Sequence, residues 1–459
     1  MRVRIPDSYI LIIYIIIILG VATYVIPSGS FDRQIDDNTG ISYVIPDSYR
    51  VVEKDSVSIF NMFKAIPEGM MRASDIIIFV LLAGGSFGII NATGVTHTLI
   101  GNIARSYIGK EKMIVLIVMT AFSLMGAIFG MSEETLPLYP IVISLALALG
   151  FDRLTGIAMI LVGTTSGFVA GFLNPFNTGI AQGIVGLPLF SGISLRIICH
   201  FIFLLSGIIF VYTHVGKINS NSNLVAANNS ECYEKIDIND FPKLSKRDKR
   251  ILIVLISSII FLVIGIMKWN FYILEISTVF IIMGILSGYV AGLKSGRMVS
   301  EFTKGASNII YGALIIGLAR AIMVVMEYGN ILDTIIYSLS KIIGGVSPIV
   351  NAVSMFIVHG IIELFISSAS GQASVTLPIM MNLADISGIT RQTAVLAFQF
   401  GDGFANIISP TAGVLMAALV LGDVDWRRWV KFIYPLVIVW SVEGIILLIT
   451  STIINYGPF

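Results

Sequence analysis

Ionisable side chains inside otherwise apolar segments are the residues of this chain whose types and places could do chemistry. Glu133 and Glu134 stand together between two apolar runs, Asp402 and Glu363 lie in later runs, and Arg320 lies midway along another. Such a group is costly to bury in a bilayer unless it is paired or hydrated, so each one is a candidate for function.

The acids lie beside a pattern that occurs twice. Thr-Leu-Pro stands at residues 135–137 and again, about 240 residues later, at 376–378. Around each copy the order is apolar helix, small polar break, apolar run, basic residue, second apolar run and a break at Asn174-Pro175 or Ser409-Pro410. Paired interruptions at corresponding positions of two halves indicate the midplane binding site of a secondary transporter.

Neutral hydrogen-bonding residues cluster at the same interruptions. Helix ends there expose unpaired N–H groups, which can hold a carboxylate, and unpaired C=O groups, which can coordinate a cation. A ligand with both a cationic group and a carboxylate fits such a site, and a basic amino acid fits it best. The predicted substrate-binding residues are Ser132, Glu133, Glu134, Thr135, Asn174, Asn177, Thr178, Ser368, Ser370, Gly371, Gln372, Asp402, Asn406, Ser409 and Thr411.

The composition is that of a polytopic membrane protein. Hydrophobic residues make up 56% of the chain and charged residues 12%, with a mean hydropathy of +0.91, against about 45–50% and about 25% in soluble domains. The net charge of +1 does not favour a nucleic-acid partner. No spaced Cys/His metal set, phosphate-binding motif or nucleophile elbow occurs, so we expect neither catalysis nor a cofactor. Cys199 and Cys232 are too few for a disulfide framework.

Basic residues between the apolar segments predict the topology, because positively charged loops stay in the cytoplasm. Arg2 and Arg4 place the N-terminus in the cytoplasm, ahead of an uncleaved first helix over 8–27. Nine transmembrane helices and two re-entrant hairpins, 113–149 and 348–388, accommodate nearly all the basic clusters. We therefore predict an all-α polytopic fold in which the two repeats have inverted orientation.

The chain divides into five parts. In order, they are 1–73, the first helix and an outer segment with short strands and no assigned chemistry; 74–214, repeat 1 with broken helix 154–187; 215–249, a cytoplasmic linker; 250–304, scaffold helices; and 305–459, repeat 2 with broken helix 392–421. We expect elevator-type transport, in which hairpins and broken helices move as one body against the scaffold. The small residues expected to line the boundary are Gly84, Gly85, Gly88, Gly312 and Gly317.

Simpler interpretations compete with these. Pro175 and Pro410 could only kink long helices, and Glu133 with Glu134 could form an ordinary loop-end pair if residues 113–131 were a full span.

Two further assignments concern single side chains. Arg320 is expected to be an internal counter-ion for Glu327, Glu363 or another acid rather than to reach the membrane surface. Trp426 and Trp429 are most simply anchors at the membrane interface.

Five longer motifs carry a family resemblance. They are Phe129-Gly-Met-Ser-Glu-Glu134, Asn174-Pro175-Phe176, Gly179-Ile-Ala-Gln182-Gly183-Ile-Val-Gly186, Ser368-Ala-Ser-Gly371-Gln372-Ala373 and Val395-Leu-Ala-Phe-Gln399-Phe-Gly401-Asp402-Gly403-Phe404. The chain resembles the C4-dicarboxylate anaerobic carrier family over nearly its whole length and, within it, the YfcC-like basic amino-acid antiporters. The resemblance implies the ion-transporter superfamily fold, with a mobile transport domain beside a scaffold, in a bacterial inner membrane.

The family name implies a dicarboxylate, whereas the subgroup name implies arginine, ornithine or lysine. A dicarboxylate site would present Arg, Lys or uncompensated helix N-termini, but the candidate tips present Glu133, Glu134 and Asp402, so electrostatics favours the basic amino acid. Exchange and import both stay open, as does coupling to protons or to sodium at sites near Asn174 and Ser409. A carboxylate or peptide carrier is the alternative, a channel or non-transporting subunit is less favoured, and a homodimer is left open.

Overall fold

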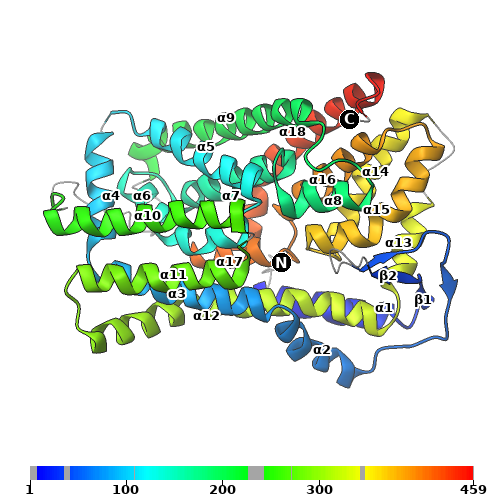
Figure 1. Cartoon of the computed structure of the whole chain (residues 1–459), viewed down its shortest axis with the longest axis horizontal. Coiled ribbons are helices and arrows are strands. Elements are labelled where there is room, and N and C mark those ends of the chain that lie inside the picture. The colour runs from blue at the N-terminus through cyan, green and yellow to red at the C-terminus, as the bar shows by residue number, and fades with distance from the viewer. Residues whose placement is uncertain are drawn as a thin grey trace.

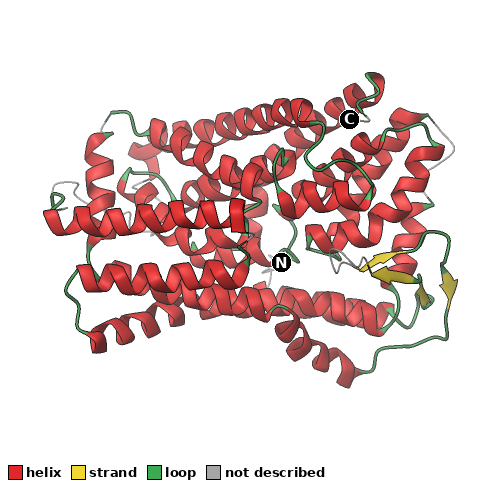
Figure 2. Cartoon of the chain, in the orientation of Figure 1, coloured by secondary structure: helices red, strands yellow, loops and turns green. Residues whose placement is uncertain are grey.

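The computed structural model describes residues 8–35, 42–107, 109–225, 242–269, 271–341 and 347–457. These residues are mostly helical, with two short antiparallel ribbons between the first two helices (Figure 2). Strand β1 (Gly29–Ser30) pairs with β4 (Arg50–Val51), and β2 (Arg33–Ile35) pairs with β3 (Ser42–Val44). Strands were predicted in this part of the outer segment. Cys232 and residues 226–241 of the predicted linker lie outside the described residues, whereas residues 215–225 continue the helix that begins at Ile193 and residues 246–249 begin the next one.

One group of helices packs around the long helix α12 and lies along the lower side of Figure 1. Its members are α1 (Ser8–Ala22), α2 (Ile59–Arg72), α3 (Ser74–Ala92), α11 (Ile273–Val290) and α12 (Ser295–Tyr328), with α10 (Lys246–Trp269) against α11. The backbones of α3 and α12 approach so closely that a Cβ on Gly88 would stand 2.9 Å from Gly305 Cα. Small residues allow such crossings in membrane helices.

A second group surrounds the very deeply buried helices α7 and α16. It contains α5 (Lys112–Phe129), α6 (Tyr139–Ala148), α7 (Arg153–Ala170), α9 (Ile193–Val225), α14 (Pro348–Glu363), α15 (Ala369–Ile386), α16 (Arg391–Asn406) and α18 (Trp426–Ile453). Two shorter elements belong to the second group by continuity of the chain: the 3-10 helix η1 (Glu133–Leu138) joins α5 to α6, and α17 (Gly413–Leu421) continues from α16. The other short elements are α4 (Val95–Ser106), the π-helix η2 (Pro175–Gly179), α8 (Ile180–Ile184) and α13 (Leu332–Ser340).

Eight helices in the described ranges are long and apolar enough to cross a membrane. Seven of them coincide with spans that the charge pattern predicts, and the eighth is α5, which was predicted as the first arm of a hairpin. These seven predicted spans are 75–92, 154–187, 194–214, 250–267, 272–293, 308–326 and 430–451. Helix α1 is a shorter apolar helix. The predicted span 392–421 is divided into α16 and α17. The fold is therefore that of a multi-pass membrane protein.

Each predicted interruption separates two helical elements. Helix α5 ends at Phe129 and α6 begins at Tyr139, while α14 ends at Glu363 and α15 begins at Ala369. Helices α5 and α6 lie towards the left of Figure 1, and α14 and α15 lie towards the right. This arrangement is compatible with two hairpins that enter from opposite sides, and the inverted repeat stays a prediction.

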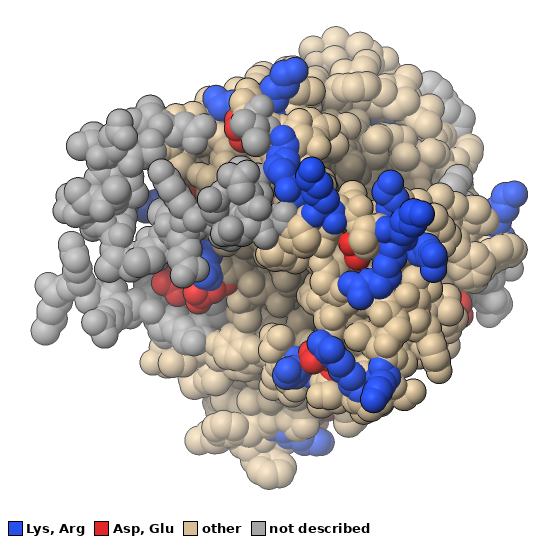
Figure 3. Space-filling view, turned by 90° about the vertical axis from the view of Figure 1, so that its left-hand side faces the viewer, with Lys and Arg blue, Asp and Glu red and all other residues tan. Residues whose placement is uncertain are grey.

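Basic side chains gather at one end of the molecule. Figure 3 views the left side of Figure 1 and shows many Lys and Arg side chains there, with few acids. Lys110 and Lys112 precede or begin α5, and Lys294 and Arg297 stand at the start of α12; all four are exposed. These are loops that the charge pattern assigns to the cytoplasm.

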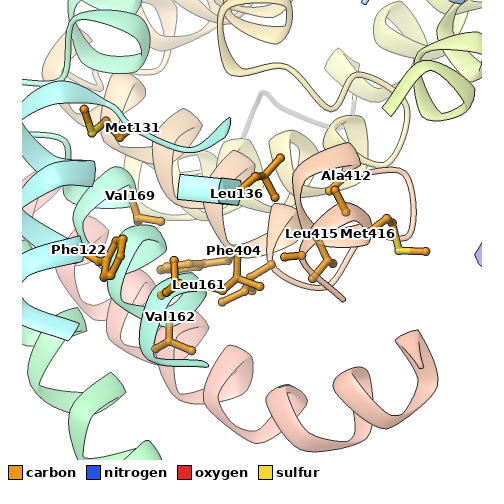
Figure 4. Close-up of a cluster of buried hydrophobic side chains, with 14 of the residues drawn as sticks. Phe122, Met131, Leu136, Leu161, Val162, Val169, Phe404, Ala412, Leu415 and Met416 are labelled. Atoms are coloured by element: carbon orange, nitrogen blue, oxygen red, sulfur yellow. The ribbon is translucent and has the colours of Figure 1, made fainter. Parts of the chain in front are cut away.

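An apolar cluster packs the segment between α5 and α6, the first tip, against the broken helices. Leu136 of η1, Val169 of α7, Phe404 of α16 and Leu415 of α17 are at most 3% exposed, and Figure 4 shows them in one cluster. The segment between α5 and α6 and the break between α16 and α17 therefore pack in one apolar core.

The glycines do not lie where the boundary prediction put them. Within the described structure, Gly84, Gly85 and Gly88 face α12, and Gly317 faces α2 and α3, so these four lie inside the first group. Gly312 alone of the five faces the second group, where its added Cβ would stand 3.4 Å from Ala417 Cβ. The prediction was wrong for four residues because small side chains favour any close helix crossing and do not mark a sliding one.

Candidate functional site

The first tip is a tight turn after α5. Gly130 ends the helix with φ of 65°, in the left-handed region that glycine adopts without strain. The Ser132 N–H donates to the Glu134 carboxylate at 3.0 Å, and the Thr135 hydroxyl donates to the Ser132 carbonyl at 2.6 Å. These bonds hold Glu134 close to the tip backbone.

The second tip is the segment between α14 and α15. Ser368 is the N-cap of α15 and accepts a hydrogen bond from the Gly371 N–H at 3.4 Å. Further along α15, Gln372 donates from Nε2 to the His359 carbonyl of α14 at 2.8 Å. Gln372 therefore ties the two arms together behind the tip.

Side chains satisfy the backbone at both helix breaks. Asn174 caps η2 by accepting from the N–H groups of Phe176 and Asn177 at 2.9 and 3.0 Å. Thr178 donates to the Gly171 carbonyl. Each bond meets a need that an interrupted helix creates, because the last carbonyls and first N–H groups lack intrahelical partners.

At the second break, the Ser409 and Thr411 hydroxyls are 2.6 Å apart. The indole N–H groups of Trp426 and Trp429 donate to the carbonyls of Ile408 and Ile407 at 3.0 and 2.8 Å. Trp429 is fully buried. The interface-anchor interpretation is therefore wrong for Trp429, and both tryptophans stabilise the break.

A cavity of about 250 Å³ lies where the two tips meet. It is bordered by both tips, both breaks and the first helix group. The residues that line it with polar or charged side chains are Arg72, Asp75, Ser132, Glu133, Glu134, Tyr272, Arg320, Ser367, Ser368, Ser370 and Asn406. Arg72, Asp75 and Tyr272 are exposed, so the cavity opens on their side.

Acids and a cation face each other across this cavity. No ion pair joins Arg320 to an acid within the described residues; its charge acts at longer range on Glu133, as does that of Asp75. Arg72 donates to Glu68 at 2.7 Å and to Glu327. Arg320 is therefore the cation of the cavity that carries no direct acidic partner.

The expected pairing of Arg320 with Glu327 or Glu363 does not occur. Glu327 pairs with Arg72, and Glu363 lies beside Asp402 in the second helix group. The expectation was based only on the positions of these residues along the chain. Which acid an arginine pairs with depends on the direction in which each helix points its side chains.

Predicted binding residues divide between the cavity and its surroundings. Those that line it are Ser132, Glu133, Glu134, Ser368, Ser370 and Asn406. Thr135 lines an adjoining cavity of about 50 Å³, which also borders Ser132 and Asn406. Neither lining includes Asn174, Asn177, Thr178, Gly371, Gln372, Asp402, Ser409 or Thr411.

Five charged or polar lining residues were not in the predicted binding set: Arg72, Asp75, Tyr272, Ser367 and Arg320, the last of which was predicted only as an internal counter-ion. Arg72, Asp75 and Tyr272 come from the first helix group, at the ends of helices that were assigned to the outer segment or the scaffold. Their signal in the sequence is weak, since charged and aromatic residues at helix ends are common at membrane interfaces.

Metal-ligand clusters are not found in the described residues: no group of three or more His, Cys, Asp or Glu side chains lies close enough to hold a metal ion. The oxygens of Asn174 and Ser409, near which sodium was expected, take part in hydrogen bonds within their own breaks. Sodium coupling stays a prediction.

Eight apolar helices in the described residues and a polar cavity between interrupted helices define a multi-pass membrane protein with an internal polar cavity. The family model for the C4-dicarboxylate anaerobic carriers, DcuC, matches residues 5–453. The chain belongs to this family, and the protein is a transporter and not an enzyme.

Two relatives span most of the chain. The "Putative basic amino acid antiporter YfcC" of Escherichia coli (strain K12) is 33% identical over 470 residues, which cover 94% of this chain and 93% of the relative. An uncharacterized protein of Haemophilus influenzae is 28% identical over 492 residues, covering 97% and 96%.

Two solved structures are similar over nearly the whole chain. The YdaH transporter of Alcanivorax borkumensis has a TM-score of 0.47 and 14% identity, with coverage of 99% of this chain and 100% of the transporter. MtrF of Neisseria gonorrhoeae, described with a class of antimetabolite efflux pumps, has a TM-score of 0.44 and 18% identity, with coverage of 98% and 96%.

Proposed function

We propose that the protein is a secondary active transporter of basic amino acids, such as arginine, ornithine and lysine, in a bacterial inner membrane. The observation that carries this proposal is the charge distribution of the cavity, where Arg320 faces Glu133 and Glu134. An amino acid with a cationic side chain has the opposite charges at its two ends.

Each end of such a ligand has a partner in this cavity. The guanidinium of Arg320 can bind a carboxylate with two parallel hydrogen bonds. Glu133 and Glu134 can accept hydrogen bonds from the guanidinium or ammonium group at the other end, and Ser368 and Asn406 add neutral hydrogen-bonding groups. A volume of about 250 Å³ suits one small ligand, since pockets for drug-sized molecules begin near ~300 Å³.

A dicarboxylate is the second candidate. Two arginines, Arg72 and Arg320, line the cavity, and the family description names C4-dicarboxylates. Arg72 is already paired with two acids, however, and the half-buried Glu133 and Glu134 would repel a second carboxylate. The printed name of the Escherichia coli relative also favours the basic amino acid.

Transport into proteoliposomes tests the choice of substrate. Purified protein should take up radiolabelled arginine, and internal ornithine should accelerate the uptake if the protein exchanges substrates. Uptake of labelled succinate that excess arginine does not inhibit would favour the dicarboxylate instead. Imposed sodium and proton gradients, applied one at a time, distinguish the coupling ion from gradient-free exchange.

We further propose an elevator mechanism. The second helix group, with both tips and both breaks, would move along the first group and carry the ligand with it. The N-terminus would lie in the cytoplasm, and on this orientation the side of the cavity that Arg72 and Tyr272 border faces outwards. A homodimer, whose first helix group could anchor the moving parts, belongs to the same proposal.

A further inference from the structure

A second polar cluster lies inside the helix group that contains the tips, away from the ligand cavity. Glu363 of α14 and Asp402 of α16 are both 0% exposed. Neither lines the cavity of about 250 Å³ or the adjoining one of about 50 Å³. Asp402 was predicted to bind substrate, and its position in the structure calls for a different role.

A close helix crossing brings the two carboxyl groups together. A Cβ on Gly401 would stand 2.6 Å from the Phe356 carbonyl and 2.8 Å from the Gly360 N–H nitrogen, so only glycine permits this approach of α14 and α16. Asp402 follows Gly401, and Glu363 lies one turn after Gly360. Their carboxyl groups are within hydrogen-bonding reach of each other.

The pair lacks any other compensating group. Among the described residues, none donates a hydrogen bond to either carboxylate, and neither carboxylate forms an ion pair with a Lys, Arg or His side chain. Two ionised carboxylates cannot remain in contact without water or a cation, because each disfavours the charge of the other. A carboxyl pair has no hydrogen to share unless at least one member is protonated.

Two polar neighbours on α14 and α15 are also incompletely bonded. His359 lies one turn before Glu363 and is 0% exposed, with no partner for Nε2 in the described structure. Gln372 is equally buried, and its Oε1 likewise has no partner there. Buried polar atoms are nearly always bonded, so this region has hydrogen-bonding capacity beside the carboxyl pair that the described protein atoms do not use.

We propose that Glu363 and Asp402 hold a shared proton and form the site through which the protein couples transport to a proton gradient. This inference rests on the transporter function proposed above. A proton is the cation that needs no coordination sphere, which suits two carboxyl groups in direct reach of each other. It would enter from water on one side of the membrane, bind a carboxylate, and leave to water on the other side.

The position of the pair links it to the ligand cavity. Glu363 is the last residue of α14, and the tip that follows it contributes Ser367 and Ser368 to the cavity. Asn406, one turn after Asp402 on α16, also lines the cavity. Loss of the proton would make the two carboxylates repel each other. This repulsion would act at the end of α14, where the second tip begins.

Other titratable groups on the surrounding helices have partners or positions of their own. Asp333 of α13 pairs with Arg33, Asp385 of α15 pairs with Arg391 of α16, Arg153 of α7 pairs with Asp423, and Glu443 of α18 bonds to Ser206. The remaining ones are His359 on α14, Tyr337 on α13 and Lys341 at its end, and Arg427, Arg428, Lys431 and Tyr434 near the start of α18. The buried Arg196 of α9 reaches α16 from outside these helices and donates to Gln399. Elements η2 and α8 contain no titratable residue.

Infrared spectroscopy of the full-length protein in lipid vesicles tests the shared proton. At neutral pH the wild type should show the C=O stretching band of a buried, protonated carboxylic acid. The band should disappear in Glu363→Gln and in Asp402→Asn, and it should persist in the matched control Glu443→Gln. Its absence from the wild type, or its persistence in both pair variants, would overturn the proposal.

A measurement without substitution covers the case in which the amide variants fail to fold. Carboxyl-labelled ¹³C-aspartate or ¹³C-glutamate, incorporated into the wild type, should shift the band in both preparations, because the proton is shared between an Asp and a Glu. The exchanged variant Glu363→Asp/Asp402→Glu keeps both acids and should keep the band. A band insensitive to both labels would contradict the assignment.

Proton movement tests the coupling. A pH-sensitive dye inside the vesicles should report proton flux during labelled arginine uptake by the wild type and none in either pair variant. Uptake that follows a sodium gradient without proton flux would overturn the proposal. A wild type that shows the pair's band but transports no arginine would instead reject the proposed substrate and retain the proton site.

Discussion

At the scale of single residues, the proposed choice of substrate depends on Arg320. It lies on α12 and lines the cavity, without a direct acidic partner in the described structure. An unpaired guanidinium in a membrane segment is costly unless water or a ligand compensates it. We therefore expect Arg320 to bind an anionic group of the substrate.

Arg320→Met should weaken arginine binding by about 1.5–3 kcal/mol, the range for a lost hydrogen bond to a charged group. Agmatine, which is arginine without its carboxylate, should bind both proteins equally, because it has nothing for Arg320 to hold. Calorimetric titration with both ligands measures the difference. Arg320→Lys, which keeps the charge, is the matched control, and equal losses for arginine and agmatine would refute this role.

Glu134→Gln should weaken binding of arginine and agmatine alike, by about 1–3 kcal/mol. Glu134 is held at the tip by the Ser132 N–H, so the substitution removes a positioned charge and leaves the shape of the tip nearly intact. The same titration measures the effect. Glu301→Gln, on α12, where Glu301 pairs with Lys304 and does not line the cavity, should change nothing. Unchanged affinity in Glu134→Gln would remove the acid from the site.

At the scale of elements, helix ends are stabilised by side chains that lie near them in sequence. Asp152 caps α7 by accepting from the Thr155 N–H at 2.8 Å, and His214 lies 3.1 Å away. Burial by itself raises the pKa of Asp152, but the hydrogen bonds from His214 and Thr155 outweigh burial and hold it below its usual value.

This lowered pKa predicts a pH dependence of stability. A carboxyl whose pKa is lower in the folded protein stabilises it above the unfolded pKa, near 3.8, and the contribution is lost as pH falls through the folded value. Asp152→Ala should lose about 0.5–2 kcal/mol at neutral pH, seen as a lower melting temperature in detergent. Asp152→Asn keeps a capping side chain, but its stability should no longer fall with pH as that of the wild type does. Identical curves of melting temperature against pH for the wild type and Asp152→Asn would exclude the mechanism.

The arms of the first tip give a prediction about sidedness. If 113–149 is a hairpin, both of its flanks lie in the cytoplasm, where the basic residues around it are expected. Single cysteines at Lys110 and Arg153, in a background without native cysteines, should react with an impermeant thiol reagent only from inside. Glu53→Cys, in the outer segment, is the control for the outside. Labelling of positions 110 and 153 from opposite sides would make α5 or α6 part of a full crossing.

At the scale of the whole molecule, the two helix groups meet where α12 packs against α17 and where α3 packs against η1. An elevator must slide along these contacts, whereas local gating would leave them fixed. Gly312 and Ala417 face each other across the first of them.

A disulfide between Gly312→Cys and Ala417→Cys should therefore lock the transporter. The Cβ separation of 3.4 Å lies close to the usual range of about 3.5–4.5 Å. In a background without native cysteines, oxidation should abolish arginine transport and spare arginine binding, and a reductant should restore transport. Each single cysteine is a control that oxidation should not affect. Normal exchange by the crosslinked protein would favour local gating of the tips.

The sequence alone determined the features that follow from local pattern. Long apolar runs with few charges favour membrane-spanning helices, and clusters of Pro, Gly and Asn between such runs favour interruptions. The class of protein and most spans therefore followed from composition and periodicity. The two tips were located because Ser132, Glu134 and Ser368 stand in polar breaks between such runs, and these residues do line the cavity.

Only the tertiary structure decided which distant side chains meet. Asp402 and Glu134 are both acids beside a break, yet Asp402 turns towards Glu363 while Glu134 lines the cavity. Arg72 and Tyr272 reach the cavity from helices to which the sequence assigned no chemistry. A local pattern fixes where a helix begins and ends, but the face that it presents to a partner hundreds of residues away depends on how the helices pack, and packing is set by all their contacts together.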